Sequence, residues 1–156
     1  MKKVIVLSVV LFASVIAMNA QPRAIGGRFT WGGELSYQHG FGERNMLQLD
    51  LGLSGLIGAY GVQLTGTYDW VFPISSWKHD GSWNWYVGPG AGLGFYDGYL
   101  FAGIAGMVGV EYNFKFPLQL SLDYRPLIGL GFGKDHELGL HTPGFYGIAL
   151  GVRYKF

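Results

Sequence analysis

The feature of this sequence that most constrains its fold is an alternation of apolar residues with polar or small residues. From Leu47 to Ser54, leucines occupy the odd positions, and Gln, Asp, Gly and Ser lie between them. The segment from Tyr146 to Phe156 repeats the pattern and carries it to the last residue. Because successive side chains of a strand point to opposite faces of a sheet, a period of two predicts β-strands with one apolar face each.

The first 20 residues form a segment of a different kind. Lys2 and Lys3 precede an apolar stretch over residues 4–17, and Ala20 ends a small-residue site before Gln21. This order is typical of a cleavable secretory signal peptide. A retained membrane helix is the alternative, but the stretch is shorter than the roughly 20 apolar residues that a spanning helix needs. We expect a signal peptide over 1–20 and one domain over 21–156.

The composition narrows the class of protein. Charged residues make up 13% of the chain, about half the usual share for a soluble domain. Beyond residue 20, nine Lys and Arg face ten Asp and Glu, and no apolar run is long enough for a membrane helix. The charge balance predicts no nucleic-acid partner, and the absence of cysteine excludes disulfides, lipoprotein attachment and thiolate chemistry. Low charge with apolar residues at alternate positions favours a transmembrane β-barrel.

The alternating segments and the turn residues between them predict an all-β, eight-stranded antiparallel up-and-down barrel. The predicted strands cover 22–30, 33–40, 45–54, 60–72, 83–95, 101–113, 118–128 and 144–156. The alternation runs without a break from Arg23 to Gln38, so a count of seven is the alternative. Single-chain bacterial barrels have even strand numbers, which favours a hairpin at Trp31–Gly33.

Aromatic residues gather at the predicted strand ends, as expected for rings at a membrane interface. One predicted girdle contains Trp70, Phe72, Trp83, Trp85, Tyr112, Phe114, Tyr154 and Phe156. The opposite girdle contains Phe29, Tyr60, Phe95 and Phe101. Ordinary enrichment of aromatic residues in strands is the alternative. Pro89 falls inside a predicted strand, and because it lacks an N–H we expect a β-bulge there.

Polar residues on the alternate positions are expected to fill the lumen. The predicted polar network contains Arg28, Glu34, Asp50, Asp69, Glu111, Asp123, Arg125, Arg153 and Lys155. An eight-stranded barrel is only wide enough for side chains to fill its interior, and buried charges must be paired. We therefore favour a salt-bridged plug over a selective pore or a catalytic carboxylate pair.

One predicted inner wall carries almost no side chains. Gly88, Gly90, Gly92 and Gly94 share a face, and Gly103, Ala105 and Gly109 continue it on the next strand. This surface leaves room for arginines from the other walls, or for a water-filled groove.

Catalytic and metal-binding patterns find little support. The predicted loop 129–144 contains His136, Glu137 and His141, but a zinc site needs three or four well-supported ligands. Serines on strands and histidines in loops do not form a catalytic triad, and no Gly-x-Ser-x-Gly elbow occurs. The glycines from Gly88 to Gly92 precede no helix pattern, so they do not indicate a phosphate loop. We expect no enzyme activity, no cofactor and no metal.

With its leader, its alternating strands and its ending Val152-Arg153-Tyr154-Lys155-Phe156, the chain resembles the small eight-stranded outer-membrane barrels of Gram-negative bacteria, the OmpA/OmpX-like and opacity-like group. The segment from Phe116 to Pro126 is similar to the penultimate strand of such barrels. The resemblance implies location in the outer membrane and contact with its lipid bilayer. It also implies that Tyr154 and Phe156 form the signal read by the barrel-assembly machinery. It implies no active-site residues.

Four functions remain as alternatives. The favoured one is a non-enzymatic barrel with a structural or surface-interaction role. The second is a small porin-like channel for ions or small solutes, and the third is a lipid-A-modifying enzyme. The fourth is a soluble lipocalin-like carrier, whose apolar face would point inward. The sequence does not indicate a ligand or an oligomeric state.

Overall fold

The computed structural model describes residues 23–30, 32–54, 61–77, 80–96, 98–133, 136–141 and 147–156. The predicted signal peptide over 1–20 lies outside these residues. The strands are β1 (Arg23–Phe29), β2 (Gly33–Phe41), β3 (Asn45–Ser54), β4 (Gly61–Pro73), β5 (Ser82–Tyr96), β6 (Tyr99–Asn113), β7 (Leu118–Tyr124), β8 (Leu127–Gly133), β9 (His136–His141) and β10 (Ile148–Lys155). Among the described residues, no helix has the length and apolar character needed to cross a membrane.

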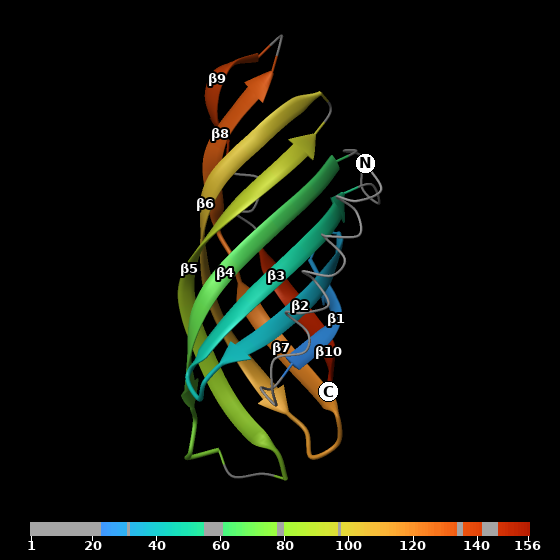
Figure 1. Ribbon diagram of the computed structural model, residues 1–156, viewed down its shortest axis with the longest axis vertical. Coiled ribbons are helices and arrows are strands. Elements are labelled where there is room, and N and C mark those ends of the chain that lie inside the picture. The colour runs from blue at the N-terminus through green and yellow to red at the C-terminus, as the bar shows by residue number, and fades with distance from the viewer. Residues whose placement is uncertain are drawn as a thin grey trace, which may run out of the picture.

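These ten strands form the eight walls of a closed antiparallel barrel (Figure 1). β1 pairs with β2 through the predicted hairpin and with β10 at the seam, where the barrel closes. β7 and β8 both pair with β6, and they do so in one unshifted register, so they are two halves of the seventh wall. β9 pairs with β8 and β10 pairs with β7, which makes them the eighth wall. The prediction of an eight-stranded antiparallel barrel is confirmed.

The seventh wall differs from its predicted strand over 118–128. It is interrupted at Arg125 and Pro126, because proline has no N–H for the ladder, and it then continues to Gly133. The Gly106 N–H donates to the Pro126 carbonyl oxygen at 3.0 Å, which keeps the interrupted wall joined to β6. The predicted loop over 129–144 is therefore wrong, since most of it forms the β8–β9 hairpin. Its glycines suggested a loop, although they alternate with Leu130 and Phe132 as strand residues do.

The bulge expected at Pro89 is also wrong. The register between β4 and β5 is the same on both sides of Pro89, and only the pairs opposite Gly88 and Pro89 are missing from the ladder. A Cβ atom on Gly88 would collide with the Tyr68 carbonyl oxygen and the Asp69 backbone. The two strands approach closely at this glycine, so the missing N–H is accommodated without an inserted residue.

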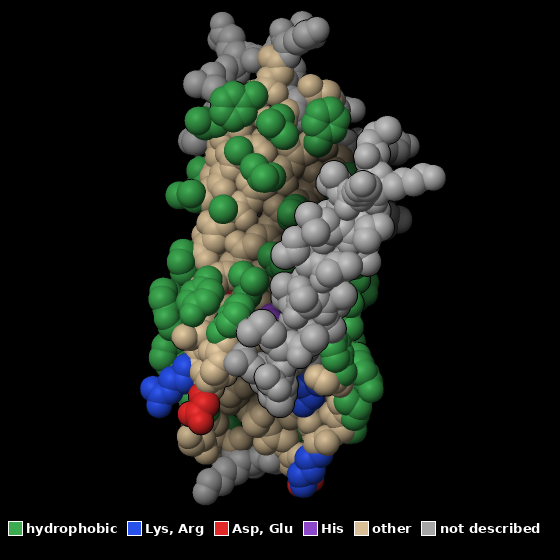
Figure 2. Space-filling view, viewed as in Figure 1, with side chains coloured by type: hydrophobic (Ala, Val, Ile, Leu, Met, Phe, Trp, Pro, Cys, Tyr) green, Lys and Arg blue, Asp and Glu red, His purple; other side chains and the backbone are tan. Residues whose placement is uncertain are grey.

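The barrel turns its apolar side chains outward and its polar side chains inward. Outer residues such as Leu53, Ile104 and Leu122 are more than half exposed, whereas Arg28, Asp50 and many other polar residues are buried. Green apolar side chains are spread over the visible surface, and charged ones gather at its lower end (Figure 2). This orientation is opposite to that of a lipocalin-like carrier, so that alternative is wrong for the described strands.

Rings at the lower ends of the strands contact one another. Phe72 stacks on Trp85 with ring centroids 4.5 Å apart, and Tyr112 lies 4.8 Å from Trp83 and 4.6 Å from Phe114. The upper girdle is partly wrong, because Phe101 is fully buried in the lumen against Ala105 and Leu127. Phe101 shares its face with Gly103 and Ala105, which leave space for its ring. Tyr60 lies outside the described residues.

Candidate functional site: the charged lumen

An ion pair crosses the lumen from one side of the barrel to the other. Arg125 follows β7 on the seventh wall, and its Nη1 donates to Asp50 Oδ2 on β3 at 2.5 Å. Its Nη2 donates to Glu34 Oε1 on β2 at 2.6 Å. The third and seventh walls of eight are diametrically opposite, so this side chain spans the interior. The Arg125 and Asp50 side chains are 5% and 1% exposed.

Arg28 extends this network to the seam. Its Nη1 lies 2.7 Å from Glu34 Oε2, and its Nη2 lies 2.5 Å from Asp123 Oδ1. Nη2 also donates to the Gly147 carbonyl oxygen at 3.2 Å. Glu34 therefore links the two arginines, and five charged side chains from four walls form one connected cluster. We call Arg28, Glu34, Asp50, Asp123 and Arg125 the central ion cluster.

Arg153 lies lower in the lumen, and its hydrogen-bond partners among the described residues are hydroxyls rather than carboxylates. Its Nε donates to Ser36 Oγ at 2.9 Å, and its Nη1 donates to Ser121 Oγ at 2.7 Å. Gly151 makes this position possible, because a Cβ there would meet Ser121 Oγ and the Arg153 guanidinium. Its Nη2 has no hydrogen-bond partner.

The two remaining carboxylates of the network, Glu111 and Asp69, form no ion pair with another described residue. Glu111 accepts hydrogen bonds from three amides: Asn84 and Gln119 at 2.8 Å, and Asn113 at 3.0 Å. Asp69 accepts one hydrogen bond, from the Thr67 hydroxyl at 2.8 Å, and its Oδ1 has no partner. The described lumen thus contains three arginines and five carboxylates. The two carboxylates outside the ion pairs, Glu111 and Asp69, accept hydrogen bonds from neutral donors.

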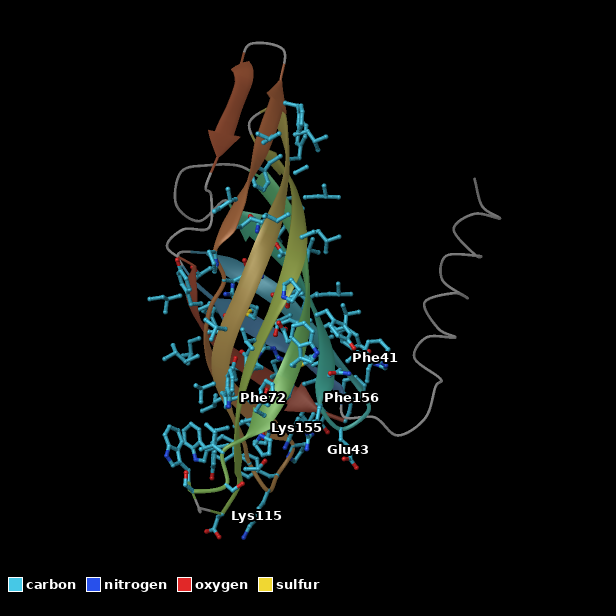
Figure 3. The ribbon with its side chains drawn as sticks, turned by 90° about the vertical axis from the view of Figure 1, so that its left-hand side faces the viewer. Phe41, Glu43, Phe72, Lys115, Lys155 and Phe156 are labelled. Carbon is cyan, nitrogen blue, oxygen red and sulfur yellow. The ribbon has the colours of Figure 1, made fainter. Side chains whose placement is uncertain are left out.

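Lys155 and its neighbours lie at the lower rim. The Lys155 Nζ donates to the Phe114 carbonyl oxygen at 3.0 Å and not to a carboxylate (Figure 3). Tyr154 and Phe156 are both more than half exposed. Lys155 is therefore outside the central ion cluster, and the two aromatic residues stand on the outer surface.

The sequence left two possibilities for the space beside the bare glycine wall, arginine side chains or a water-filled groove, and at Gly88, Gly92 and Gly109 the structure places other side chains there. A Cβ on Gly92 would meet Leu127, one on Gly88 would meet Asp69 Oδ1, and one on Gly109 would meet the Tyr86 ring. Side chains of β4, β5 and β8 occupy the space beside these glycines, whereas Arg28 and Arg125 extend toward carboxylates of β2, β3 and β7. The glycines therefore serve as flat surfaces against which these side chains pack.

Two lumen residues, Gln48 and Tyr86, were not singled out from the sequence. Gln48 accepts a hydrogen bond from Gln38 and donates one to Asp50, both at 2.8 Å. The Tyr86 hydroxyl donates to Asp123 Oδ2 at 3.1 Å. Each of these residues stands at an inward position of its strand, so the alternation predicts that its side chain faces the lumen. The alternation does not predict which residue it bonds to.

Groups suited to metal binding or nucleophilic catalysis are not assembled in the described part of the chain. No cluster of three or more His, Asp or Glu that could hold a metal ion occurs there. Ser36 and Ser121 bind Arg153 rather than a histidine. The side chains of His136, Glu137 and His141 lie outside the described residues. The arrangement supports charge compensation inside a narrow barrel.

Comparison of the chain with protein-family models, with curated proteins and with solved structures gave no match.

Proposed function

We propose that this chain is an integral outer-membrane β-barrel with a closed lumen and a non-enzymatic role, structural or in surface interactions. The observation that carries the proposal is the ion pair between Arg125 and Asp50, which joins opposite walls. A water-filled channel needs an open path along the axis, whereas this pair and Arg28 occupy the middle of the barrel. The ion pairs of the central ion cluster favour a plug that holds the walls together.

The membrane location is supported by the distribution of apolar surface. A soluble barrel buries its large apolar side chains, but here leucines, valines and aromatic residues are exposed on all sides of the described wall. Water at this surface would be unfavourable, while lipid chains would match it. The predicted signal peptide is consistent with export.

The assembly signal is part of the same proposal. Tyr154 and Phe156 are exposed beside the lower rim, where another protein can reach them before insertion. We expect the barrel-assembly machinery to read these two rings, and we expect no nucleic-acid partner and no cofactor.

The test is the conductance of purified, refolded protein in planar bilayers, together with the fractionation of cells that express it. The proposal expects outer-membrane localisation and no steady conductance. Arg125→Ala is expected to produce a leak, since it removes the bridge across the lumen. A steady, salt-dependent conductance of the unaltered protein would instead establish the alternative, a small porin-like channel.

A further inference from the structure

The outer apolar band of this barrel has two very different heights. On β2 it runs from Leu35 down to Phe41, which are six positions apart. On β6 it runs from Leu100 down to Tyr112, which are twelve positions apart. With a rise of about 3.3 Å per residue and a strand tilt of about 40°, these spans correspond to roughly 15 Å and 30 Å along the axis.

The low side includes the neighbours of β2. On β1, the outermost exposed apolar residues are Ile25 and Phe29, only four positions apart. β1 ends at Phe29 and β2 begins at Gly33, so both strands end at this height. The tall side continues from β6 to β8, where Leu130 and Phe132 are exposed near the upper end. Figure 1 shows β5, β6 and β8 rising well above β1 and β2.

The lower edge of the band is level in comparison. Phe41 contacts Tyr68, and Tyr68 contacts Trp70, with ring centroids 6.4 and 6.1 Å apart. Contacts between Phe72 and Trp85 and between Trp83 and Tyr112 continue the row as far as β6. Figure 3 shows Phe41, Phe72 and Phe156 at a similar level, with Glu43 and Lys115 below them. The difference in height therefore arises at the upper end.

We propose that the bilayer is thinner beside β1 and β2 than beside β5, β6 and β8, an inference that rests on the proposed membrane location. The hydrocarbon core of a bilayer is about 30 Å thick, which matches the tall side and is about twice the low side. A rigid tilt of the barrel would draw part of the lower aromatic row into the hydrocarbon. Lipid deformation has only a modest cost per ångström of mismatch, so the lipid adapts beside the low wall.

The depth of two matched outer positions tests the proposal. Leu35 on the low side and Val108 on the tall side are both exposed. On the same scale they lie roughly 15 Å and 10 Å above the lower edge, so each would be in the central part of a bilayer of uniform thickness. The chain has no cysteine, so Leu35→Cys and Val108→Cys each give a single site for a bimane label. The labelled proteins are refolded into dioleoylphosphatidylcholine vesicles. These vesicles contain lipids with a doxyl quencher at either acyl carbon 5 or acyl carbon 12.

We expect the shallow quencher to act at least about twofold more strongly than the deep one on the label at position 35. We expect the reverse order at position 108. Preferential deep quenching at both positions would overturn the inference and leave the membrane location intact. No quenching at either position would contradict the membrane location itself.

A second pair of labels separates thinning from tilt. Phe41→Cys and Tyr112→Cys mark the lower edge on the low and the tall side. Thinning at the upper end predicts shallow quenching at both positions. A label that is deep at one of them and shallow at the other would show that the barrel tilts, and it would overturn local thinning.

Substitution by arginine provides a measurement that needs no label. Arginine near the middle of a bilayer lowers the folding equilibrium constant roughly 30- to 700-fold, and near an interface the loss is about fivefold or less. We expect the large loss for Val108→Arg and the small one for Leu35→Arg, measured by urea unfolding in the same vesicles. Equal large losses would contradict a thin region at β2.

Discussion

The ring of Tyr86 lies over the bare backbone of Gly109, on the neighbouring strand of the barrel. A Cβ atom on Gly109 would be 2.5 Å from both Cζ and the hydroxyl oxygen of Tyr86. The same hydroxyl donates to Asp123 at 3.1 Å, and Asp123 belongs to the central ion cluster. The glycine thus sets the position of a ring that supports the charged centre of the lumen.

Gly109→Ala is therefore expected to destabilise the barrel by about 1–3 kcal/mol, the usual cost of overpacking a filled interior. The methyl group would push Tyr86 away from Asp123. Urea unfolding in vesicles measures this effect. Gly106→Ala is the matched control on the same strand, because its added Cβ would meet only Pro126, at 3.7 Å. An equal loss in both variants would contradict the role given to Tyr86.

Removal of the Arg125 side chain tests the energy of the central ion cluster. Arg125→Ala leaves Asp50 without its cation in a buried site, and Glu34 keeps only Arg28. Breaking such a pair costs about 3–5 kcal/mol. Lys115→Ala is the control, since its pair with Asp80 is exposed and such pairs contribute about 0–1 kcal/mol. A loss as small as that of the control would indicate that water reaches Asp50.

Glu111 and Asp69, which form no ion pair with another described residue, are expected to respond differently to neutral substitutions. Glu111→Gln brings an NH₂ group to face three amide donors, so we expect a loss of about 1–3 kcal/mol. Asp69→Asn removes a buried charge that accepts only one hydrogen bond. We expect this variant to be neutral or more stable. Unfolding curves of the two variants at one pH measure the two losses, and a larger loss for Asp69→Asn would contradict the different roles given to these carboxylates.

Deletion of Phe156 should separate assembly from stability. The ring is exposed and outside the central ion cluster, so its loss is expected to change unfolding in vesicles by less than about 1 kcal/mol. In cells, the amount of protein in the outer membrane should fall several-fold, because the proposed recognition signal is incomplete. Phe156→Tyr keeps a terminal aromatic ring and should restore assembly. A normal outer-membrane level after the deletion would remove the signal role.

The local pattern of the sequence was sufficient for much of the fold. Alternation around Leu47 to Ser54 predicted β3, because it depends on neighbouring residues alone. The hairpin before Gly33 was predicted from the even strand number of the whole barrel, since the local alternation does not break there. The glycine-rich segment from Leu127 to Gly133 was misjudged, since glycine favours turns and also lines crowded inner walls. Its role is decided by strands far away in the sequence.

The partners inside the lumen could not be predicted from the same pattern. The alternation identifies Arg125 and Asp50 as inward residues, but they are 75 positions apart and meet only through the curvature and stagger of the closed sheet. Lys155 has the same parity as lumen residues and yet ends at the rim, beside the Phe114 carbonyl. Which charges meet depends on the height of each residue, and that height follows from the register of all eight walls.

The contact between Arg28 and Asp123 has a consequence for the order of folding. These residues are 95 positions apart, and their ion pair crosses the seam between β1 and β10. If all the other strand pairings formed but the seam between β1 and β10 stayed open, Arg28 would still be far from Asp123. Closure of the seam therefore coincides with the neutralisation of buried charge, and a half-open barrel carries an electrostatic penalty. The barrel should unfold from a closed state in one cooperative step, without prior fraying of its first and last strands.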